Sequence, residues 1–229
     1  MEAESVDGPR PISNGMTEEG VLDVLERVGA FRAGHFVFTS GRHGDKYINK
    51  DALYPFTKET SQLCRAMAEL FKDLDVHAVV GPAVGAAILS QWTAHHLSEF
   101  LGRDVSAVYA DKDGQGGFVV RRGYDRIISG RNIVIVEDLL TTGGSVKKTI
   151  EAARAVGAKV VGVTAIANRG GVQPTDLGLN GDVRFNPLLN VHLESWEKKD
   201  CPMCARAVPV ATDVGHGKEF LARQTASSV

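Results

Sequence analysis

The hydrophobic pattern alternates between strand-like and helix-like segments over most of the chain. Short uncharged runs rich in Val, Ile and Ala indicate buried strands, whereas apolar residues spaced three or four positions apart indicate amphipathic helices. This alternation predicts an α/β fold, with an open, mostly parallel, twisted sheet flanked by helices. The expected strands are residues 76–80, 105–110, 118–120, 132–136 and 159–167, and the expected helices begin at Thr57, Gly85 and Ser145.

The N-terminal part of the chain has a different pattern. Residues 1–16 are polar and acidic and contain no apolar core, so they do not form a secretory signal, and we expect a flexible tail. Thr17 is placed to cap a helix that Gly29 ends. Residues 36–53 have alternating and aromatic character between glycines, which predicts a hairpin or short strands.

The length of 229 residues fits one large domain with additions at its ends. After the tail, we expect the main domain over residues 17–195 and a cysteine-containing extension over residues 196–229. The formal net charge of −2 provides no basic field for nucleic acid, and no apolar run is long enough to span a membrane. Three cysteines in a chain of this length do not suggest a disulfide framework, which favours the reducing cytoplasm.

The segment with the most specific chemistry is residues 133–145, with the sequence IVIVEDLLTTGGS. An uncharged strand is followed by Glu137 and Asp138, then by a loop of small residues, and then by a helix. Such a loop lets backbone N–H groups approach an anion closely, and the start of the helix favours the same negative charge. This predicted phosphate loop consists of Thr141, Thr142, Gly143, Gly144 and Ser145.

The two acids suit a different group of the ligand. Glu137 and Asp138 would repel a phosphate, but they can accept hydrogen bonds from the paired hydroxyls of a ribose. A phosphate site beside a diol site predicts binding of a ribose 5-phosphate. The segment lacks the lysine of a nucleotide-binding P-loop and the three glycines of a dinucleotide site. The alternative is an ordinary strand-to-helix turn with solvated acids.

The stretch VIVEDLLTTGGS resembles the phosphoribosylpyrophosphate-binding motif of the type I phosphoribosyltransferases. Four further segments resemble the orotate branch of this family, and the matches extend in the expected order over about residues 20–170. The resemblance implies the type I phosphoribosyltransferase fold with a small N-terminal hood, a Mg²⁺ cofactor and a homodimer. The four segments are residues 36–43, 46–49, 81–85 and 168–171.

The resemblance also implies a pyrophosphate site built from a loop and from basic side chains. The loop follows a strand, often holds a strained or cis peptide in the family, and offers backbone N–H groups to an anion. Arginine side chains bind such polyanions with two parallel hydrogen bonds. The alternatives are a plain strand-to-helix turn and solvated arginines on an edge strand. The residues concerned are Ala83, Val84, Gly85, Lys112, Arg121 and Arg122.

For the base, the resemblance implies two groups of contacts. Lys46, Tyr47 and Ile48 match the segment that packs on the orotate ring in the family. Arg169 matches the arginine that pairs with the polar edge of the base, and Thr141 is also expected to contact the base. An Arg fork suits the carboxylate of orotate. The alternative for Tyr47 is an ordinary strand residue.

Two features depart from the family pattern. Asn168 replaces the acid that usually precedes the arginine. Residues 123–130 lack the lysine and histidine that usually follow the basic pair, although Arg126 can supply a charge. A weaker activity and a base other than orotate therefore stay open.

The predicted reaction transfers a phosphoribosyl group from phosphoribosylpyrophosphate to orotate, giving orotidine 5′-monophosphate and pyrophosphate in pyrimidine nucleotide synthesis. Glu137 and Asp138 are expected to hold the ribose hydroxyls, with Mg²⁺ bound by Asp138 or by ligand oxygens. Arg121 and Arg122 are expected to neutralise the leaving pyrophosphate. The alternatives are a purine-base enzyme of the same family and a non-catalytic regulator that senses phosphoribosylpyrophosphate.

Cys201 and Cys204 have the spacing of one half of a zinc site. A complete site needs four ligands, and His192, His216 or a second copy of the chain can supply the others. The alternative is a reduced structural pair of cysteines. Three other histidines are expected in solvated or capping roles: His43, His95 and His96.

Overall fold

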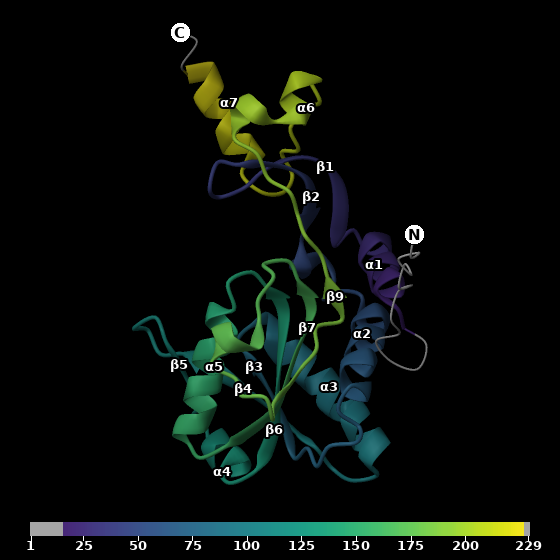
Figure 1. The fold of residues 1–229 in the computed structure, drawn as a ribbon, viewed down its shortest axis with the longest axis vertical. Coiled ribbons are helices and arrows are strands. Elements are labelled where there is room, and N and C mark those ends of the chain that lie inside the picture. Colours follow the sequence, from purple (N-terminus) through teal and green to yellow (C-terminus); the bar gives the residue numbers. More distant parts are fainter. Residues whose placement is uncertain (1–15, 227–229) are drawn as a thin grey trace, which may run out of the picture. The chain divides into compact units, whose positions relative to one another are not determined.

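The computed structural model describes residues 16–226 of the chain, and their contacts form two compact units. We call these the sheet unit and the hairpin unit, and each is built from two separate stretches of sequence (Figure 1). The tail predicted over residues 1–16 lies outside the described residues, apart from Met16. The sheet unit comprises residues 16–24 and 54–191, and the hairpin unit comprises residues 25–53 and 192–226.

The sheet unit contains the predicted open and mostly parallel sheet, with strand order β5-β4-β3-β6-β7-β8 and with β9 also paired to β7. All of these pairings are parallel except that between β4 and β5, which form an antiparallel hairpin. Parallel pairing needs long crossover connections, and the helices between the strands provide them. The strands are β3 (Ala78–Pro82), β4 (Ser106–Lys112), β5 (Phe118–Val119), β6 (Asn132–Leu140), β7 (Lys159–Asn168), β8 (Arg184–Phe185) and β9 (Leu189–Asn190).

Helices cover both faces of this sheet, with α2 and α3 on one side and α4 and α5 on the other (Figure 1). The predicted cap of the first helix is confirmed, because the Thr17 hydroxyl accepts a hydrogen bond from the Gly20 N–H at 3.2 Å. No helix within residues 16–226 combines the length and the apolar composition needed to cross a membrane. The first five helices in chain order are α1 (Glu18–Arg27), α2 (Thr57–Glu69), α3 (Gly85–Leu101), α4 (Tyr124–Ile128) and α5 (Gly144–Ala155).

Burial of both faces of the central strand β6 explains the uncharged sequence of its first part, residues 132–136. Ile133 and Ile135 point to one face and pack in the same hydrophobic cluster as Ile150 of α5. Val134 and Val136 alternate with them and are also fully buried. Each such side chain contributes about 1.5–3 kcal/mol to stability by leaving water. This core holds the carboxyl end of β6, and therefore the phosphate loop, in a fixed position.

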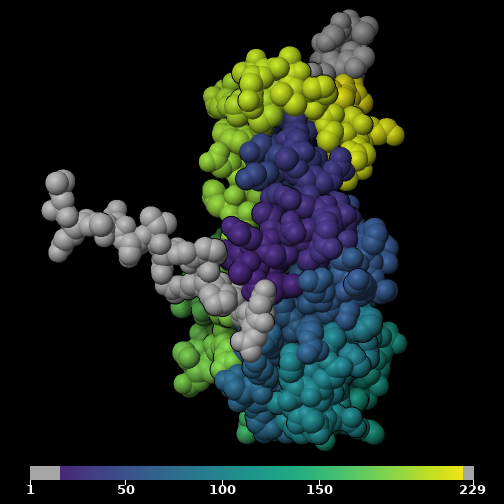
Figure 2. Space-filling model, turned by 90° about the vertical axis from the view of Figure 1, so that its right-hand side faces the viewer, coloured from purple at the N-terminus to yellow at the C-terminus, as the bar shows by residue number. Residues whose placement is uncertain are grey.

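The hairpin unit confirms the predicted hairpin and adds the C-terminal extension to it. Strands β1 (Phe31–Val37) and β2 (His43–Ile48) pair in antiparallel fashion. The extension pairs with both strands, since His35 forms a bridge with Val210 and His43 forms one with Trp196. Figure 2 shows the yellow C-terminal residues against the blue hairpin residues of this unit. The remaining elements are η1 (Lys50–Ala52), η2 (Pro174–Leu177), η3 (Lys198–Asp200), α6 (Pro202–Ala205) and α7 (Gly217–Ala226).

Candidate functional site

The predicted phosphate loop, residues 141–145, joins β6 to α5 and surrounds a small polar hollow of about 130 Å³. Gly143 has a φ of 72°, in the left-handed region that favours glycine, and a side chain there would collide with Leu177. The Gly144 N–H donates to the Thr142 hydroxyl at 3.4 Å, which tightens the turn. Because α5 begins at this turn, its first N–H groups are available to an anion.

Strand β6 is longer than the sequence pattern predicted, and it includes both acids. The backbone of Glu137 pairs with Ala165 of β7, and pairing continues to Leu140. The polar side chains hid this extension, because a buried strand is expected to be apolar. Since side chains alternate along a strand, Glu137 and Asp138 point to opposite faces of the sheet.

Glu137 is the acid that lines the phosphate-loop hollow. Its side chain is 7% exposed, and its Oε1 atom accepts a hydrogen bond from the Asp138 N–H at 2.9 Å. This bond fixes the carboxylate at the base of the loop. A group that enters the hollow therefore meets N–H and hydroxyl donors on one side and a fixed acceptor on the other.

Asp138 is held on the opposite face by a residue that the sequence did not indicate. The Tyr54 hydroxyl donates to the Asp138 Oδ2 atom at 2.6 Å. A Cβ atom added at Gly85 would lie 2.7 Å from the same oxygen and 2.3 Å from the Tyr54 hydroxyl. The backbone of Gly85 thus runs directly against this carboxylate, and only glycine fits there. A lone tyrosine before a proline carries no pattern that could have predicted this contact.

The predicted pyrophosphate loop, residues 83–85, lies between β3 and α3. Its Ala83–Val84 peptide bond is cis, as the family resemblance implies. The Ala83 N–H donates to the Ala110 carbonyl oxygen at 2.9 Å, which attaches the loop to β4. Val84 is 80% exposed, so the tip of the loop faces solvent.

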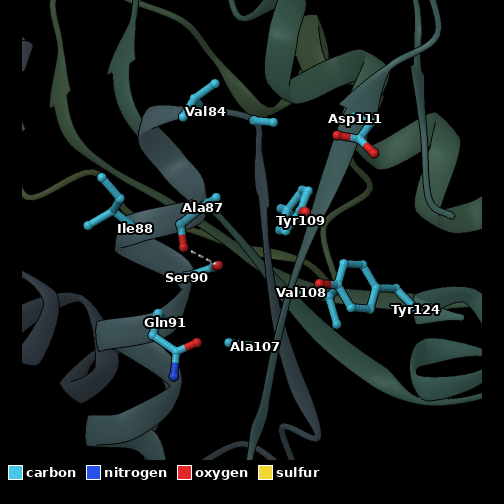
Figure 3. A pocket seen from close by; sticks show the side chains of 11 residues that line it. Val84, Ala87, Ile88, Ser90, Gln91, Ala107, Val108, Tyr109, Asp111 and Tyr124 are labelled. Atoms are coloured by element: carbon cyan, nitrogen blue, oxygen red, sulfur yellow. Dashed lines mark hydrogen bonds between the residues drawn. The ribbon is translucent and has the colours of Figure 1, made fainter. Parts of the chain in front are cut away.

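A larger hollow of about 490 Å³ adjoins this loop (Figure 3). One wall comes from α3 and the other from β4, and Tyr124 of α4 closes one end. Small and apolar side chains dominate the surface, and the acidic side chain of Asp111 lies at the rim (Figure 3). The lining residues are Ala83, Val84, Ala87, Ile88, Ser90, Gln91, Ala107, Val108, Tyr109, Asp111 and Tyr124.

The predicted basic residues gather around Asp111. Its Oδ2 atom accepts a hydrogen bond from Arg122 Nε at 3.0 Å and lies 3.6 Å from Arg121 Nε. The Arg121 guanidinium also donates to the backbone carbonyl of Lys112 at 3.0 Å. Hydrogen bonding to Asp111 raises the pKa of Arg122 above its usual value. Both arginines are at least half exposed, so their ion pairs are open to exchange with an anionic ligand.

Arg169 is held beside the phosphate loop, as expected. Its Nε atom donates to the Thr141 hydroxyl at 3.1 Å. The N–H groups of Arg169 and Gly170 both donate to the Leu140 carbonyl oxygen, at 3.0 and 3.1 Å. A guanidinium is therefore anchored within one side chain's reach of the loop that begins at Thr141.

Asn168, which replaces the acid of the family pattern, closes the adjoining turn. Its Nδ2 atom donates to the Val172 carbonyl at 3.0 Å, and its Oδ1 atom accepts from the Val172 N–H at 3.0 Å. Nδ2 also approaches the Asn190 Oδ1 atom at 3.3 Å. A carboxylate cannot donate, so an amide is the residue type that satisfies both groups of Val172.

The predicted base-binding segment, Lys46 to Ile48, lies on β2 in the hairpin unit. Tyr47 stacks on Phe36 with ring centroids 5.3 Å apart, and on Phe38 at 6.5 Å. These contacts give Tyr47 a structural role within the hairpin. The predicted contact of this segment with a base stays a prediction.

The acids at the end of β6 offer oxygen ligands of the kind that Mg²⁺ prefers. Asp138 fits this role through its position, because its buried carboxylate adjoins the Gly85 backbone and is oriented by Tyr54. A cation there would lie between the acid and the predicted pyrophosphate loop. The residues present therefore fit the Mg²⁺ that the resemblance implies.

Cys201 and Cys204 lie beside histidines other than those proposed from the sequence. Their nearest histidines are His35 and His43, on the two strands of the hairpin. The solvated or capping role expected for His43 is wrong, because its side chain is fully buried. His216 instead pairs with the Thr39 hydroxyl at 3.0 Å.

Comparison with known proteins places these features in a family. The sequence profile described as “Phosphoribosyl transferase domain” matches residues 57–177. An orotate phosphoribosyltransferase of Thermoanaerobacter sp. (strain X514) is 32% identical over 195 residues, which cover 85% of this chain and 96% of the relative. The enzyme of the same name from Thermotoga maritima is 35% identical over 189 residues, with 82% and 94% of the two chains covered.

A solved structure gives the same result for the fold. Orotate phosphoribosyltransferase of Mycobacterium tuberculosis H37Rv, crystallised in complex with Fe(III) dicitrate, superposes with a TM-score of 0.61 and 25% sequence identity. The superposition covers 75% of this chain and 96% of that chain. The similarity therefore extends over nearly the whole length of the solved protein.

Proposed function

Since this chain belongs to the type I phosphoribosyltransferase family and is similar to its orotate branch, we propose that it makes orotidine 5′-monophosphate from orotate and phosphoribosylpyrophosphate. The observation that carries the proposal is the arrangement at the end of β6. The phosphate loop suits the 5′-phosphate of phosphoribosylpyrophosphate, and the buried Glu137 beside it suits the ribose hydroxyls. Asp138 is fixed against the second loop, which suits the pyrophosphate.

In this proposal, the 5′-phosphate binds at the loop side of the hollow, and Glu137 on the other side is left to the ribose hydroxyls. Backbone N–H groups at the start of α5 and the hydroxyls of Thr141, Thr142 and Ser145 donate to its oxygens. Gly143 keeps the turn tight, which allows the backbone to approach. The loop is preformed, so little conformational entropy is lost when the phosphate binds.

The ribose hydroxyls are held by the two acids. Glu137 and Asp138 accept hydrogen bonds from them, and Tyr54 keeps the Asp138 carboxylate in a single orientation. The sugar is then fixed at both ends, by its phosphate and by its diol. Fixing the reacting carbon in this way contributes to the rate by proximity and orientation.

The leaving pyrophosphate lies at the 83–85 loop, where Arg121, Arg122 and Lys112 neutralise its charge. As the C1–O bond breaks, its electron pair goes to pyrophosphate, and the ribose becomes oxocarbenium-like. Donors that are already in place stabilise that developing charge. Asp138 and the oxygens of the ligand would hold Mg²⁺, which would supply neutralising charge to the pyrophosphate. For this exchange, the two arginines give up their ion pairs with Asp111.

The base completes the reaction through a ring nitrogen, which forms the new bond to C1 and gives up its proton to the released pyrophosphate. Arg169, anchored on Thr141, is placed to pair with the carboxylate of orotate. A guanidinium fork matches a carboxylate in geometry as well as in charge. A purine base has no carboxylate to pair with Arg169, so this arginine favours orotate as the substrate.

A base-by-base assay with labelled phosphoribosylpyrophosphate, with and without Mg²⁺, tests the proposal. We expect nucleotide product from orotate only, and a loss of turnover in the Glu137→Gln, Asp138→Asn double variant with its fold retained. Product from adenine or guanine alone would identify a purine enzyme. Absence of product from every base, together with tight binding of phosphoribosylpyrophosphate, would identify a regulator.

The arginines have a separate test. Arg121→Ala and Arg122→Ala should lower kcat by more than they weaken binding of ribose 5-phosphate, because the arginines act on the leaving group. Arg131→Ala is the control, since Arg131 is an exposed arginine that precedes β6, at the end of the strand opposite the phosphate loop. Unchanged rates in the first two variants would place the pyrophosphate contacts elsewhere.

The proposed assembly is a homodimer that acts in the cytoplasm, as the family resemblance implies. Light scattering after size-exclusion chromatography measures the assembly directly. A mass of one chain at assay concentrations would remove the dimer from the proposal and leave the reaction unaffected.

A further inference from the structure

Four metal-binding side chains come together in the hairpin unit, far from the phosphate loop in sequence. His35 lies on β1, His43 begins β2, and Cys201 and Cys204 flank the start of α6. Their ligand atoms all lie within 4.8 Å of one another. His35, His43 and Cys201 are at most 3% exposed, and Cys204 is partly buried. Polar groups that converge in this way inside a small unit need a shared partner.

The spacing of these atoms fits a single tetrahedral ion. Cys201 Sγ lies 3.6 Å from His35 Nε2, and Cys204 Sγ lies 3.7 Å from the same atom and 3.4 Å from His43 Nδ1. Tetrahedral zinc with ordinary bond lengths sets nitrogen and sulfur ligands roughly 3.6 Å apart. The two histidine nitrogens are 2.7 Å apart, so an ion would separate the rings by a few tenths of an ångström each.

A hydrogen bond on its other ring nitrogen orients His35 for coordination. His35 Nδ1 lies 2.8 Å from the Val208 carbonyl oxygen, so it carries the proton, and Nε2 keeps its lone pair toward the cysteines. A second hydrogen bond of this type orients most metal-bound histidines in proteins. His43 presents its Nδ1 atom to the same centre, 3.4 Å from Cys204 Sγ.

From this cluster we propose that the hairpin unit contains a structural zinc site with the ligands His35, His43, Cys201 and Cys204. Two cysteines and two histidines around one centre are a common ligand set for structural zinc. A two-iron cluster with the same residues would bind the cysteines to one iron and the histidines to the other. The close N–S distances favour one ion over that arrangement.

The site gives the C-terminal extension a function. It joins the Cys201–Cys204 turn to both strands of the hairpin, over a sequence separation of 166 residues between His35 and Cys201. It also fixes the first residue of β2, the strand that carries Lys46 to Ile48. Metal binding therefore contributes directly to the folding free energy of this unit.

The first test is the metal content of the full-length, untagged protein, measured by plasma mass spectrometry. We expect one zinc per chain, lost in the Cys201→Ser, Cys204→Ser double variant and in His35→Ala. Cys64→Ala and His216→Ala are matched controls, because Cys64 lies in α2 and His216 pairs with Thr39; both should keep the metal. Wild type that contains no zinc and does not take it up after reduction would overturn the proposal.

A second test avoids variants that fail to fold. In wild type, a chelator should make two thiols reactive toward a thiol reagent while zinc is released in equal amount to the protein. Cys64 should stay unreactive, because burial raises its pKa to about 12. Replacement by Co²⁺ should give the intense visible bands of tetrahedral coordination. Thiols that react equally before chelation, or a disulfide between Cys201 and Cys204, would contradict the site.

The zinc site and the proposed activity fail independently. Calorimetry with phosphoribosylpyrophosphate reports on the sheet unit, whereas zinc stoichiometry reports on the hairpin unit. Zinc present in a protein that binds no phosphoribosylpyrophosphate would retain this inference and remove the proposed function.

Discussion

At the scale of residues, a close backbone contact between Gly170 and Thr141 determines the shape of the phosphate loop. Gly170 lies so close to Thr141 that an added Cβ atom would be 1.6 Å from the Thr141 carbonyl oxygen. The neighbouring Arg169 donates to the Thr141 hydroxyl. The backbone of the turn after β7 therefore packs directly against the backbone of Thr141, the first residue of the loop. This contact leaves no room for a side chain at Gly170.

Gly170→Ala should displace this loop and weaken substrate binding. Overpacking of this kind costs about 1–3 kcal/mol, and each 1.4 kcal/mol is tenfold in affinity. We expect the Kd for phosphoribosylpyrophosphate, measured by calorimetry with Mg²⁺, to rise by roughly tenfold or more. Gly181→Ala is the control, because a Cβ atom there meets nothing within 4 Å. Equal affinities in the two variants would show that Thr141 does not shape the site.

The sequence predicted a site residue only where that residue belongs to a continuous motif. Glu137, Asp138 and the phosphate loop are contiguous, so their chemical roles could be predicted from the sequence. Tyr54 and Asp111 were not predicted, because each acts through a contact with a residue distant in sequence or on another element. His35 and His43, which lie beside the two cysteines, were not proposed as their partners for the same reason, since only the fold brings them together.

At the scale of elements, periodicity located the central strands and helices, and the differences lie where the signal was short or polar. Helix α3 begins at Gly85 as predicted, and Gly157 follows α5 with a φ of 85°, in the left-handed region that commonly ends helices. Strand β6 continues through two acids, which a hydrophobic pattern cannot show. Helix α4 has only five residues, fewer than two turns, so no amphipathic period could reveal it.

One ion pair links two elements of the sheet unit. Arg184 of β8 donates to both carboxylate oxygens of Asp73, at 2.6 and 2.8 Å, and also to the backbone carbonyl of Leu70 at the end of α2. These hydrogen bonds lower the pKa of Asp73 to about 2. An edge strand of two residues is thereby attached to a helix on one face of the sheet.

The pair predicts a pH dependence of stability with a definite sign. The folded pKa of Asp73 lies below the unfolded value of about 3.9, so the contribution is present above that value. It is lost as the pH falls through about 2. Because Asp73 is 63% exposed, screening by solvent keeps it small, and we expect Asp73→Asn to lower the free energy of unfolding by less than ~1 kcal/mol at neutral pH.

Urea unfolding from neutral to acidic pH checks this expectation. The difference between wild type and Asp73→Asn should shrink steadily as the pH approaches 2, while the contact between Arg184 and Leu70 persists in both proteins. Asp182→Asn, at an exposed position of the same unit, controls for the change in net charge. A difference that grows toward acid would mean that the ion pair does not act through Asp73 ionisation.

At the scale of the whole molecule, the hairpin unit is built from two segments that are separated in the sequence by residues 54–191 of the sheet unit. Residues 25–53 supply the strands, and residues 192–226 supply the extension that covers them. Contacts between such distant segments carry a large loop-closure cost, which short strands alone offset poorly. The proposed metal site joins the two segments, so its binding free energy offsets the loop-closure cost. Arg42 adds hydrogen bonds between the segments, to Ser195 and Glu197.

Hydrogen exchange can read the two units separately in one intact protein. Phosphoribosylpyrophosphate with Mg²⁺ should slow exchange at residues 81–85 and 141–145, because a ligand bound to the native state suppresses local opening. A zinc chelator should speed exchange at residues 31–48 and 201–206, because the hairpin unit loses its metal.

The Glu137→Gln, Asp138→Asn variant should lose only the slowing of exchange by phosphoribosylpyrophosphate. The Cys201→Ser, Cys204→Ser variant should exchange like chelated wild type and keep protection by the substrate at 141–145. Chelator effects confined to 141–145 would assign the bound zinc to the phosphate site and contradict a structural metal in the hairpin unit.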